Sequence, residues 1–265
     1  MDQQRASRRY DFPRWFVARW AASALLGRRR ELWRDGRELL RAVPPTVEGR
    51  EHLPEGARFV VVMNHYERPG LDVWWPALAV NSTLGPPDLR WIITNRFYRY
   101  RLLGRIPVPV RLVAAVLRLV AHTYDYVSIE RRPEGIAVRA VALRRMRRAL
   151  DSERPRPLGS TPEAEFGGGV ALRNPYPSSG KALAWLSRGE VPIVPIGVSD
   201  DGERIVLRIG RPFVLEWPGA REARAQRDAL ATRVMREIAA VLPEAQRGGW
   251  APQRLTEHTE HGDLG

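Results

Sequence analysis

The stretch Arg58-Phe-Val-Val-Val-Met-Asn-His65 has the composition of a buried strand that ends in polar side chains. A continuous run of β-branched residues is typical of a strand covered on both faces. In open α/β sheets ligands bind beyond the strand ends, which puts His65 where chemistry takes place. Asp72 follows after a turn at Pro69-Gly70. An imidazole near a carboxylate can act as a general base with an orienting acid. The alternative is an ordinary loop histidine beside an unrelated aspartate.

Further segments that read as strands alternate with segments that read as helices. The expected strands lie near 89–94, 125–130, 191–197 and 203–209. The expected helices lie near 70–82, 97–120 with an interruption at Pro107 and Pro109, 135–151, 178–188 and 219–242. This order predicts an α/β fold, with a mixed, largely parallel sheet flanked by helices. Residues 204–215 alternate like a half-exposed edge strand, and 152–160 read as a connecting loop.

The chain divides into three parts by composition. Its 265 residues can bury one sizeable core, which is assigned to residues 46–245. Residues 1–45 form an N-terminal amphipathic helical segment, expected to be helical over 13–42 and to end at two prolines. Residues 246–265 read as a polar tail with little to bury.

The N-terminal segment has the features of an interfacial membrane helix. Aromatic anchors and arginines alternate in it, namely Phe12, Trp15, Phe16 and Trp20 with Arg14, Arg19 and Arg28–Arg30. No apolar run in the chain reaches the roughly 18 residues of a spanning helix. The alternative is an amphipathic helix that packs on the protein's own core.

The charge composition limits the kinds of partner. The net charge is +13, and there is no cysteine. A basic surface attracts nucleic acid, anionic lipid or phosphorylated substrates. Zinc-finger spacing and RNA-recognition aromatics are not found, so no nucleic-acid partner is predicted and a membrane surface with anionic lipid is favoured. Without cysteine there is no thiolate metal site, and the scattered histidines predict no metal site either.

A second block of motifs carries a family resemblance. Thr161-Pro-Glu-Ala164 precedes Gly189-Glu-Val-Pro-Ile-Val-Pro-Ile-Gly197. With Asn64-His65 before them, these motifs resemble the lysophospholipid acyltransferase family, the 1-acyl-sn-glycerol-3-phosphate acyltransferases, over about residues 47–250. That family has Asn-His-x4-Asp, an Arg after a short strand, Phe-Pro-Glu-Gly, and Val-Pro-Ile-Val-Pro. This chain departs from the pattern, because its spacing is His-x6-Asp and the Gly-Thr-Arg is replaced by residues 164–166.

The resemblance implies a function for the first group of residues. A fatty acyl group would move from acyl-CoA or acyl carrier protein to the hydroxyl of a glycerolipid, with a lysophosphatidate-like acceptor. The reaction would be a step of phospholipid biosynthesis. His65 would be the catalytic base, and Asp72 would orient it, with Glu67 as the alternative carboxylate. No metal or redox cofactor is implied, since the acyl thioester is a cosubstrate. The protein would act at the cytoplasmic face of the membrane, as a peripheral or monotopic protein.

The resemblance also implies acceptor-binding residues. Arg131 follows a short strand at the place where the family holds the acceptor phosphate, with the adjacent Arg132 as the alternative. Arg68 could grip a phosphate through two parallel hydrogen bonds. Glu163 would bond the acceptor or support its loop, and Arg173 could replace the missing cation.

Two other functions stay open. One is a non-catalytic lipid-binding relative in which the altered loop has lost the dyad. The other is a basic nucleic-acid-binding protein, which would need its arginines on one continuous face.

Overall fold

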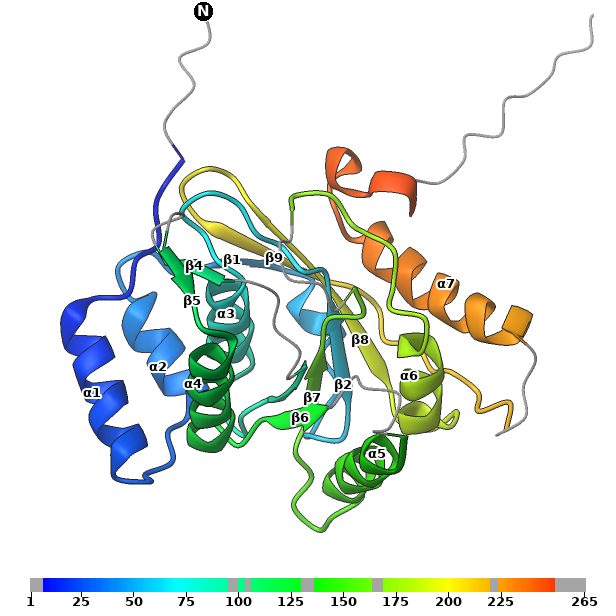
Figure 1. Ribbon diagram of the computed structural model, residues 1–265. Helices are drawn as coiled ribbons and strands as arrows, with labels where there is room; N and C mark the ends of the chain where they lie inside the picture. The colour runs from blue at the N-terminus through cyan, green and yellow to red at the C-terminus, as the bar shows by residue number, and fades with distance from the viewer. Residues whose placement is uncertain are drawn as a thin grey trace, which may run out of the picture.

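A seven-stranded sheet forms the centre of the part of the chain that the structure describes (Figure 1). The structure is a computed structural model and describes residues 7–94, 100–102, 106–129, 136–163, 169–219 and 224–250. The strand order is β1-β9-β8-β2-β7-β3-β6, and every neighbouring pair is parallel except β8 with β9. The bounds are β1 Thr46–Glu48, β2 Val60–Met63, β3 Arg90–Thr94, β6 Val127–Ile129, β7 Leu158–Ser160, β8 Ile193–Asp200 and β9 Ile205–Ile209. The predicted mixed, largely parallel α/β sheet is confirmed.

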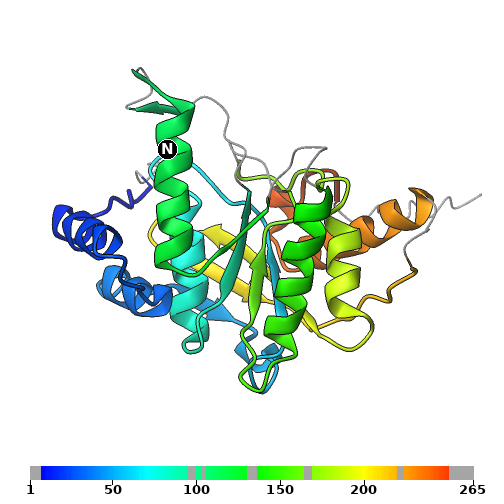
Figure 2. The same cartoon turned by 60° about the horizontal axis from the view of Figure 1, so that its bottom comes forward.

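Helices cover both faces of this sheet (Figures 1 and 2). One face carries α1 to α4 and the other carries α5 to α7. The bounds are α1 Arg14–Leu25, α2 Leu32–Leu39, α3 Trp74–Leu84, α4 Val110–Thr123, α5 Ile136–Leu150, α6 Ser179–Ser187 and α7 Arg224–Ala240. Short 3₁₀ turns lie at Arg50–His52, Glu244–Gln246 and Gly248–Trp250.

The central strand β2 explains why its run is wholly apolar. Successive side chains of a strand point to opposite faces. Val61 and Met63 belong to the core cluster on the α1–α4 side, whereas Val60 and Val62 belong to the cluster on the α5–α7 side. All four are at most 1% exposed. Because both faces are covered, no position in this strand can be polar until the strand ends at Asn64.

Three predicted segments, a loop, an edge strand and a helix, were wrong in detail. Residues 152–160 are not only a loop, because β7 lies between β2 and β3. Gly159 permits this, since a Cβ there would come within 2.7 Å of the Leu89 and Trp91 side chains. The strand within 204–215 is β9, which is buried between β1 and β8 and is not an edge. The expected helix over 97–120 is instead a hairpin, β4 Tyr100–Leu102 with β5 Ile106–Val108, followed by α4.

The N-terminal segment forms two helices where one was expected. Gly27, with φ of +64°, follows the last turn of α1 in a left-handed conformation that favours glycine. Of the four expected aromatic anchors, Phe16 is buried and Phe12 and Trp20 are half-buried, while Trp15 is 49% exposed. The helix therefore packs on the core through most of its aromatic residues, as the alternative interpretation predicted.

The two ends of the described chain also contact the body. The backbone N–H of Tyr10 donates to the carbonyl of Gly70 over 2.7 Å, which ties the segment before α1 to the loop after His65. Near the other end, the N–H of Leu172 donates to the carbonyl of Gln246. The first residues of the expected polar tail thus belong to the fold, and 251–265 lie outside the described residues. Among the described helices, none combines the length and the apolar character needed to cross a bilayer.

Candidate active site at the carboxyl end of the sheet

Asn64 and His65 emerge where β2 ends, as the sequence predicted. The Asn64 side chain is buried and bonds the backbone of Val198 in both directions, donating to its carbonyl over 2.9 Å and accepting from its N–H over 2.7 Å. A side-chain amide thereby continues the ladder between β2 and β8 past the last paired residues. The backbone that carries His65 is fixed on this side.

Glu163 fixes the same backbone from the other neighbouring strand. It follows β7, which is parallel to β2, so the two strand ends meet at one edge of the sheet. One carboxylate oxygen of Glu163 accepts the N–H of His65 over 2.7 Å, and the other accepts the N–H of Arg173 over 2.8 Å. Glu163 is only 3% exposed. Of its two predicted roles, loop support is the one that these bonds describe.

Burial determines the charge state of the His65 imidazole. The residue is 9% exposed. Loss of water lowers the pKa of His65 from 6.5 to about 4, and the positive charge of Arg173 adds to this effect. An imidazolium is poorly solvated in such a place, so the neutral form is favoured. At physiological pH His65 is a neutral imidazole that can accept a proton.

A cleft of about 540 Å³ lies next to Glu163, whose carboxylate holds the His65 backbone, and His65 itself is not among the lining residues. The cleft is lined by Glu163, Leu172, Arg173, Asn174, Pro175, Tyr176, Pro177, Gly249 and Trp250. Two hydrogen bonds to backbone carbonyls hold its walls together. The indole N–H of Trp250 donates to the carbonyl of Arg173 over 3.1 Å, and the backbone N–H of Tyr176 donates to the carbonyl of Pro162 over 2.9 Å. The size is that of a small-molecule site, and Arg173 gives it a cation.

Arg68 forms an ion pair with Asp200 that was not predicted from the sequence. Its guanidinium donates to both carboxylate oxygens of Asp200, over 2.6 Å and 3.1 Å, and the hydroxyl of Tyr66 donates to the same carboxylate. Burial alone would raise the pKa of Asp200, but the bonds from Arg68 and Tyr66 outweigh it and lower that pKa. The guanidinium group that was predicted to bind a substrate phosphate is bound to Asp200 instead. Arg68 holds the His65 loop against the end of β8.

The two carboxylates proposed as partners of His65 lie in different surroundings. Asp72 is exposed, at the start of α3, where its backbone carbonyl accepts the N–H of Trp75. Among the described residues, no hydrogen bond joins the Asp72 carboxylate to the His65 ring. Glu67 is half-buried, and its N–H donates to the carbonyl of Gly169 over 3.4 Å. Asp72 is therefore not paired with the His65 ring in this conformation, and a pairing of His65 with Glu67 stays a prediction.

Arg131 lies outside the described residues. Within the described ranges, no group of three or more histidine, aspartate or glutamate side chains is arranged to hold a metal ion. Asp200 was not predicted as a site residue, although a polar side chain at the end of a buried strand is the signal that identified His65.

Comparisons with known proteins give distant likenesses among solved structures alone. No protein-family model matches the chain, and no curated protein sequence matches it. Among solved structures, the chain is similar to the 1-acyl-sn-glycerophosphate (LPA) acyltransferase PlsC from Thermotoga maritima. The sequence identity is 14%, the match covers 85% of this chain and 88% of that chain, and the TM-score is 0.47. A likeness this distant assigns no activity to the chain.

Proposed function

We propose that this protein is an acyltransferase that moves a fatty acyl group from acyl-CoA or acyl carrier protein to the hydroxyl of a glycerolipid, with a lysophosphatidate-like acceptor. The observation that carries the proposal is the position of His65. This residue lies at the carboxyl end of the central strand, and its imidazole is neutral. Its backbone N–H is bound by Glu163, which lines a cleft. The motif resemblance around His65 and Glu163 supports the same reaction class.

The chemistry assigned to His65 requires a neutral imidazole. An imidazole nitrogen takes the proton of the acceptor hydroxyl, and the oxygen forms a bond to the thioester carbonyl carbon. The resulting oxyanion collapses, the carbon–sulfur bond breaks, and the thiolate leaves with the proton that His65 held. Burial keeps the imidazole unprotonated until substrate arrives. Asp72 or Glu67 is proposed to stabilise the imidazolium that forms in between, which requires one of them to approach the ring once substrate is bound.

The cleft next to Glu163 is proposed to hold the acceptor. Since the guanidinium of Arg68 is paired with Asp200, Arg173 takes over the role of the cation near the catalytic base. Arg131 is proposed, from the motif resemblance, to bind the acceptor phosphate. The protein is proposed to work at the cytoplasmic face of the membrane, without metal or redox cofactor and without a nucleic-acid partner.

One observation favours a second function, a lipid-binding relative without catalysis. The carboxylate of Asp72 is exposed and not bonded to the His65 ring. A base that Asp72 does not orient would be a weaker catalyst, while the cleft would still bind lipid.

Incubation with acyl-CoA and a panel of lysolipids, with the products identified by mass, separates the two functions. An acyltransferase yields an acylated lipid whose formation falls by roughly 10²–10⁴ in a folded His65→Ala variant. The matched control is His122→Ala, which removes an exposed histidine of α4. If lipid binds and no product forms with acyl-CoA or acyl carrier protein as donor, the binding function replaces the acyltransferase.

A further inference from the structure

The described chain ends in two 3₁₀ turns that close over the loop lining the cleft. We call this segment, residues 244–250, the C-terminal clasp. Its Gln246 carbonyl accepts the backbone N–H of Leu172 over 2.7 Å. At Gly248 the two segments are so close that an added Cβ would lie 2.6 Å from the Leu172 carbonyl oxygen. Only glycine fits there, so the clasp and the loop are matched in shape.

Arg173, on this loop, is held at both of its backbone polar groups. Its N–H donates to a carboxylate oxygen of Glu163 over 2.8 Å, and its carbonyl accepts the indole N–H of Trp250 over 3.1 Å. The other carboxylate oxygen of Glu163 accepts the N–H of His65 over 2.7 Å. A chain of three hydrogen bonds thereby joins the clasp to the backbone that carries the proposed catalytic base. A shift of the clasp acts first on Arg173.

The side chain of Arg173 lies near the His65 loop. An added Cβ at Gly169 would lie 3.6 Å from a terminal guanidinium nitrogen of Arg173. Gly169 pairs with Tyr66, and its carbonyl accepts the N–H of Glu67. Burial lowers the pKa of His65 to about 4, and the charge of Arg173 contributes to that shift. Because Arg173 is exposed and its side chain is long, the position of its charge depends on how firmly its backbone is held.

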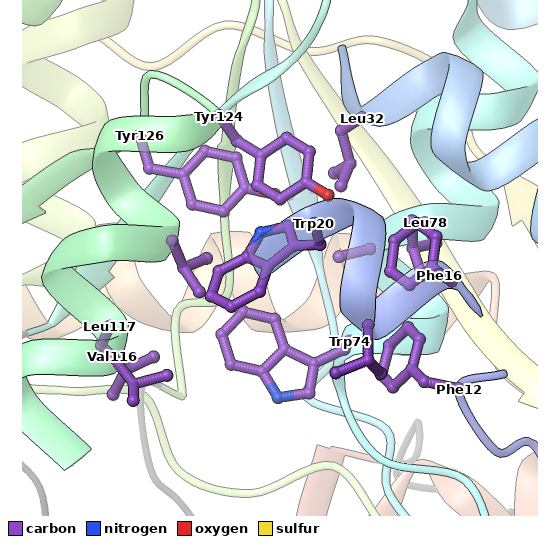
Figure 3. A pocket seen from close by; sticks show the side chains of 13 residues that line it. Phe12, Phe16, Trp20, Leu32, Trp74, Leu78, Val116, Leu117, Tyr124 and Tyr126 are labelled. Atoms are coloured by element: carbon purple, nitrogen blue, oxygen red, sulfur yellow. The ribbon is translucent and has the colours of Figure 1, made fainter. Parts of the chain in front are cut away.

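The cleft is the place where a charged group of a ligand can be recognised, since Arg173 and Asn174 line it. Figure 3 shows a separate pocket of about 290 Å³, whose described lining comes from α1, α3, α4 and nearby residues and contains no charged side chain. An apolar lining does not distinguish a phosphate from a hydroxyl, whereas a guanidinium held in place binds the phosphate through charge-assisted hydrogen bonds. The position of Arg173 therefore governs which headgroup the cleft prefers.

We propose that the C-terminal clasp, through the indole of Trp250, positions Arg173 and thereby sets the preference of the cleft for a phosphorylated acceptor over an uncharged one. Trp250 is a positioning residue, because it acts on the acceptor through the Arg173 guanidinium. Loss of the indole N–H removes one of the two bonds that hold the Arg173 backbone, so the charge spreads over more conformations. That the ligand of the cleft is an acyl acceptor rests on the proposed function, whereas the coupling of the clasp to Arg173 does not.

The preference is tested by steady-state kinetics with lysophosphatidate and with monoacylglycerol. Trp250→Phe keeps an aromatic ring and removes the indole N–H. The KM for lysophosphatidate should rise roughly threefold to tenfold, the usual effect of one lost hydrogen bond, while kcat and the KM values for monoacylglycerol and acyl-CoA stay unchanged. The matched control is Trp185→Phe, which changes a half-buried tryptophan of α6 outside the cleft and should change no constant. An equal rise in KM for both acceptors would overturn the proposal.

The coupling is tested without turnover, by NMR titration of the His65 imidazole C–H signal. Arg173→Gln removes the positive charge and should raise the midpoint of this titration. Trp250→Phe should raise it in the same direction by a smaller amount. The double variant should match Arg173→Gln alone, because a positioning residue has no effect once its target is gone. Additive shifts in the double variant, or an unchanged midpoint in Trp250→Phe, would refute the coupling.

A second variant displaces the clasp by a different route. The methyl group of Gly248→Ala would meet the Leu172 carbonyl, whereas Gly56→Ala places an alanine at a comparable positive φ with no neighbour within 4 Å. The first variant should raise the His65 midpoint and the second should not, and equal midpoints would contradict the proposal. If the wild-type protein acylates no acceptor, the proposed function fails, and the NMR titrations still decide whether the clasp positions Arg173.

Discussion

Protonation of His65 should lower the free energy of unfolding at acid pH, and a substitution of this residue should remove that effect. In the unfolded chain a histidine takes up a proton near pH 6.5, whereas burial, aided by Arg173, lowers the pKa of His65 in the fold to about 4. Between these two values the unfolded state binds more protons than the folded state. Stability therefore falls as pH falls, and the loss from this side chain begins near pH 6.5 and is complete near pH 4.

The size of the effect follows from the two pKa values. At about 1.4 kcal/mol per pKa unit, the full loss is about 3 kcal/mol, and about 2 kcal/mol of it is already present at pH 5. His65→Gln removes the titrating group and keeps a polar side chain. The free energy of unfolding of the wild-type protein should then fall about 2 kcal/mol further than that of the variant between pH 7.5 and pH 5.

Urea unfolding followed by tryptophan fluorescence measures this difference across a series of pH values. His122→Gln is the control, since it removes an exposed imidazole from α4. In parallel, the imidazole C–H signal of His65 in NMR should titrate near pH 4, and the acid limb of kcat/KM should follow the same pKa. Parallel stability curves for wild type and His65→Gln, with an NMR midpoint near 6.5, would refute the claim that the ring is held neutral by burial.

Three further substitutions test the surroundings of the base. Glu163→Gln leaves one of two buried backbone N–H groups without an acceptor, so urea unfolding should show a loss of about 1–3 kcal/mol, with no loss in the exposed control Glu55→Gln. Asp72→Asn should lower kcat more than Glu67→Gln if Asp72 moves to the ring; the reverse order gives the role to Glu67, and two mild effects exclude a dyad. Asp200→Asn leaves a buried guanidinium without its carboxylate and should lower the unfolding free energy by about 3 kcal/mol, read from thermal unfolding.

Local patterns in the sequence were sufficient for the central strand and for the α/β class of the fold. The apolar run before Asn64 predicts a strand covered on both faces, because only such a strand excludes polar residues at every position. The alternation of strands with helices predicts the α/β class. The same reasoning missed β7, because three residues ending in Ser160 have no pattern of their own and become a strand only between β2 and β3. It predicted β9 as an edge strand, because an alternating sequence does not show which other strands pair with it.

The site divides in the same way between sequence and structure. That His65 ends a buried strand is a local property, and it could be read from the sequence. Its neutral state, the bond from its backbone to Glu163 and the pairing of Arg68 with Asp200 join residues roughly 100 or more positions apart, so only the folded chain decides them. Likewise, arginines and aromatic residues predicted a membrane helix, but the depth to which each aromatic side chain is buried depends on packing against α3 and α4. Composition gives a segment its affinity for an apolar surface, and tertiary contacts decide whether that surface is the protein or the bilayer.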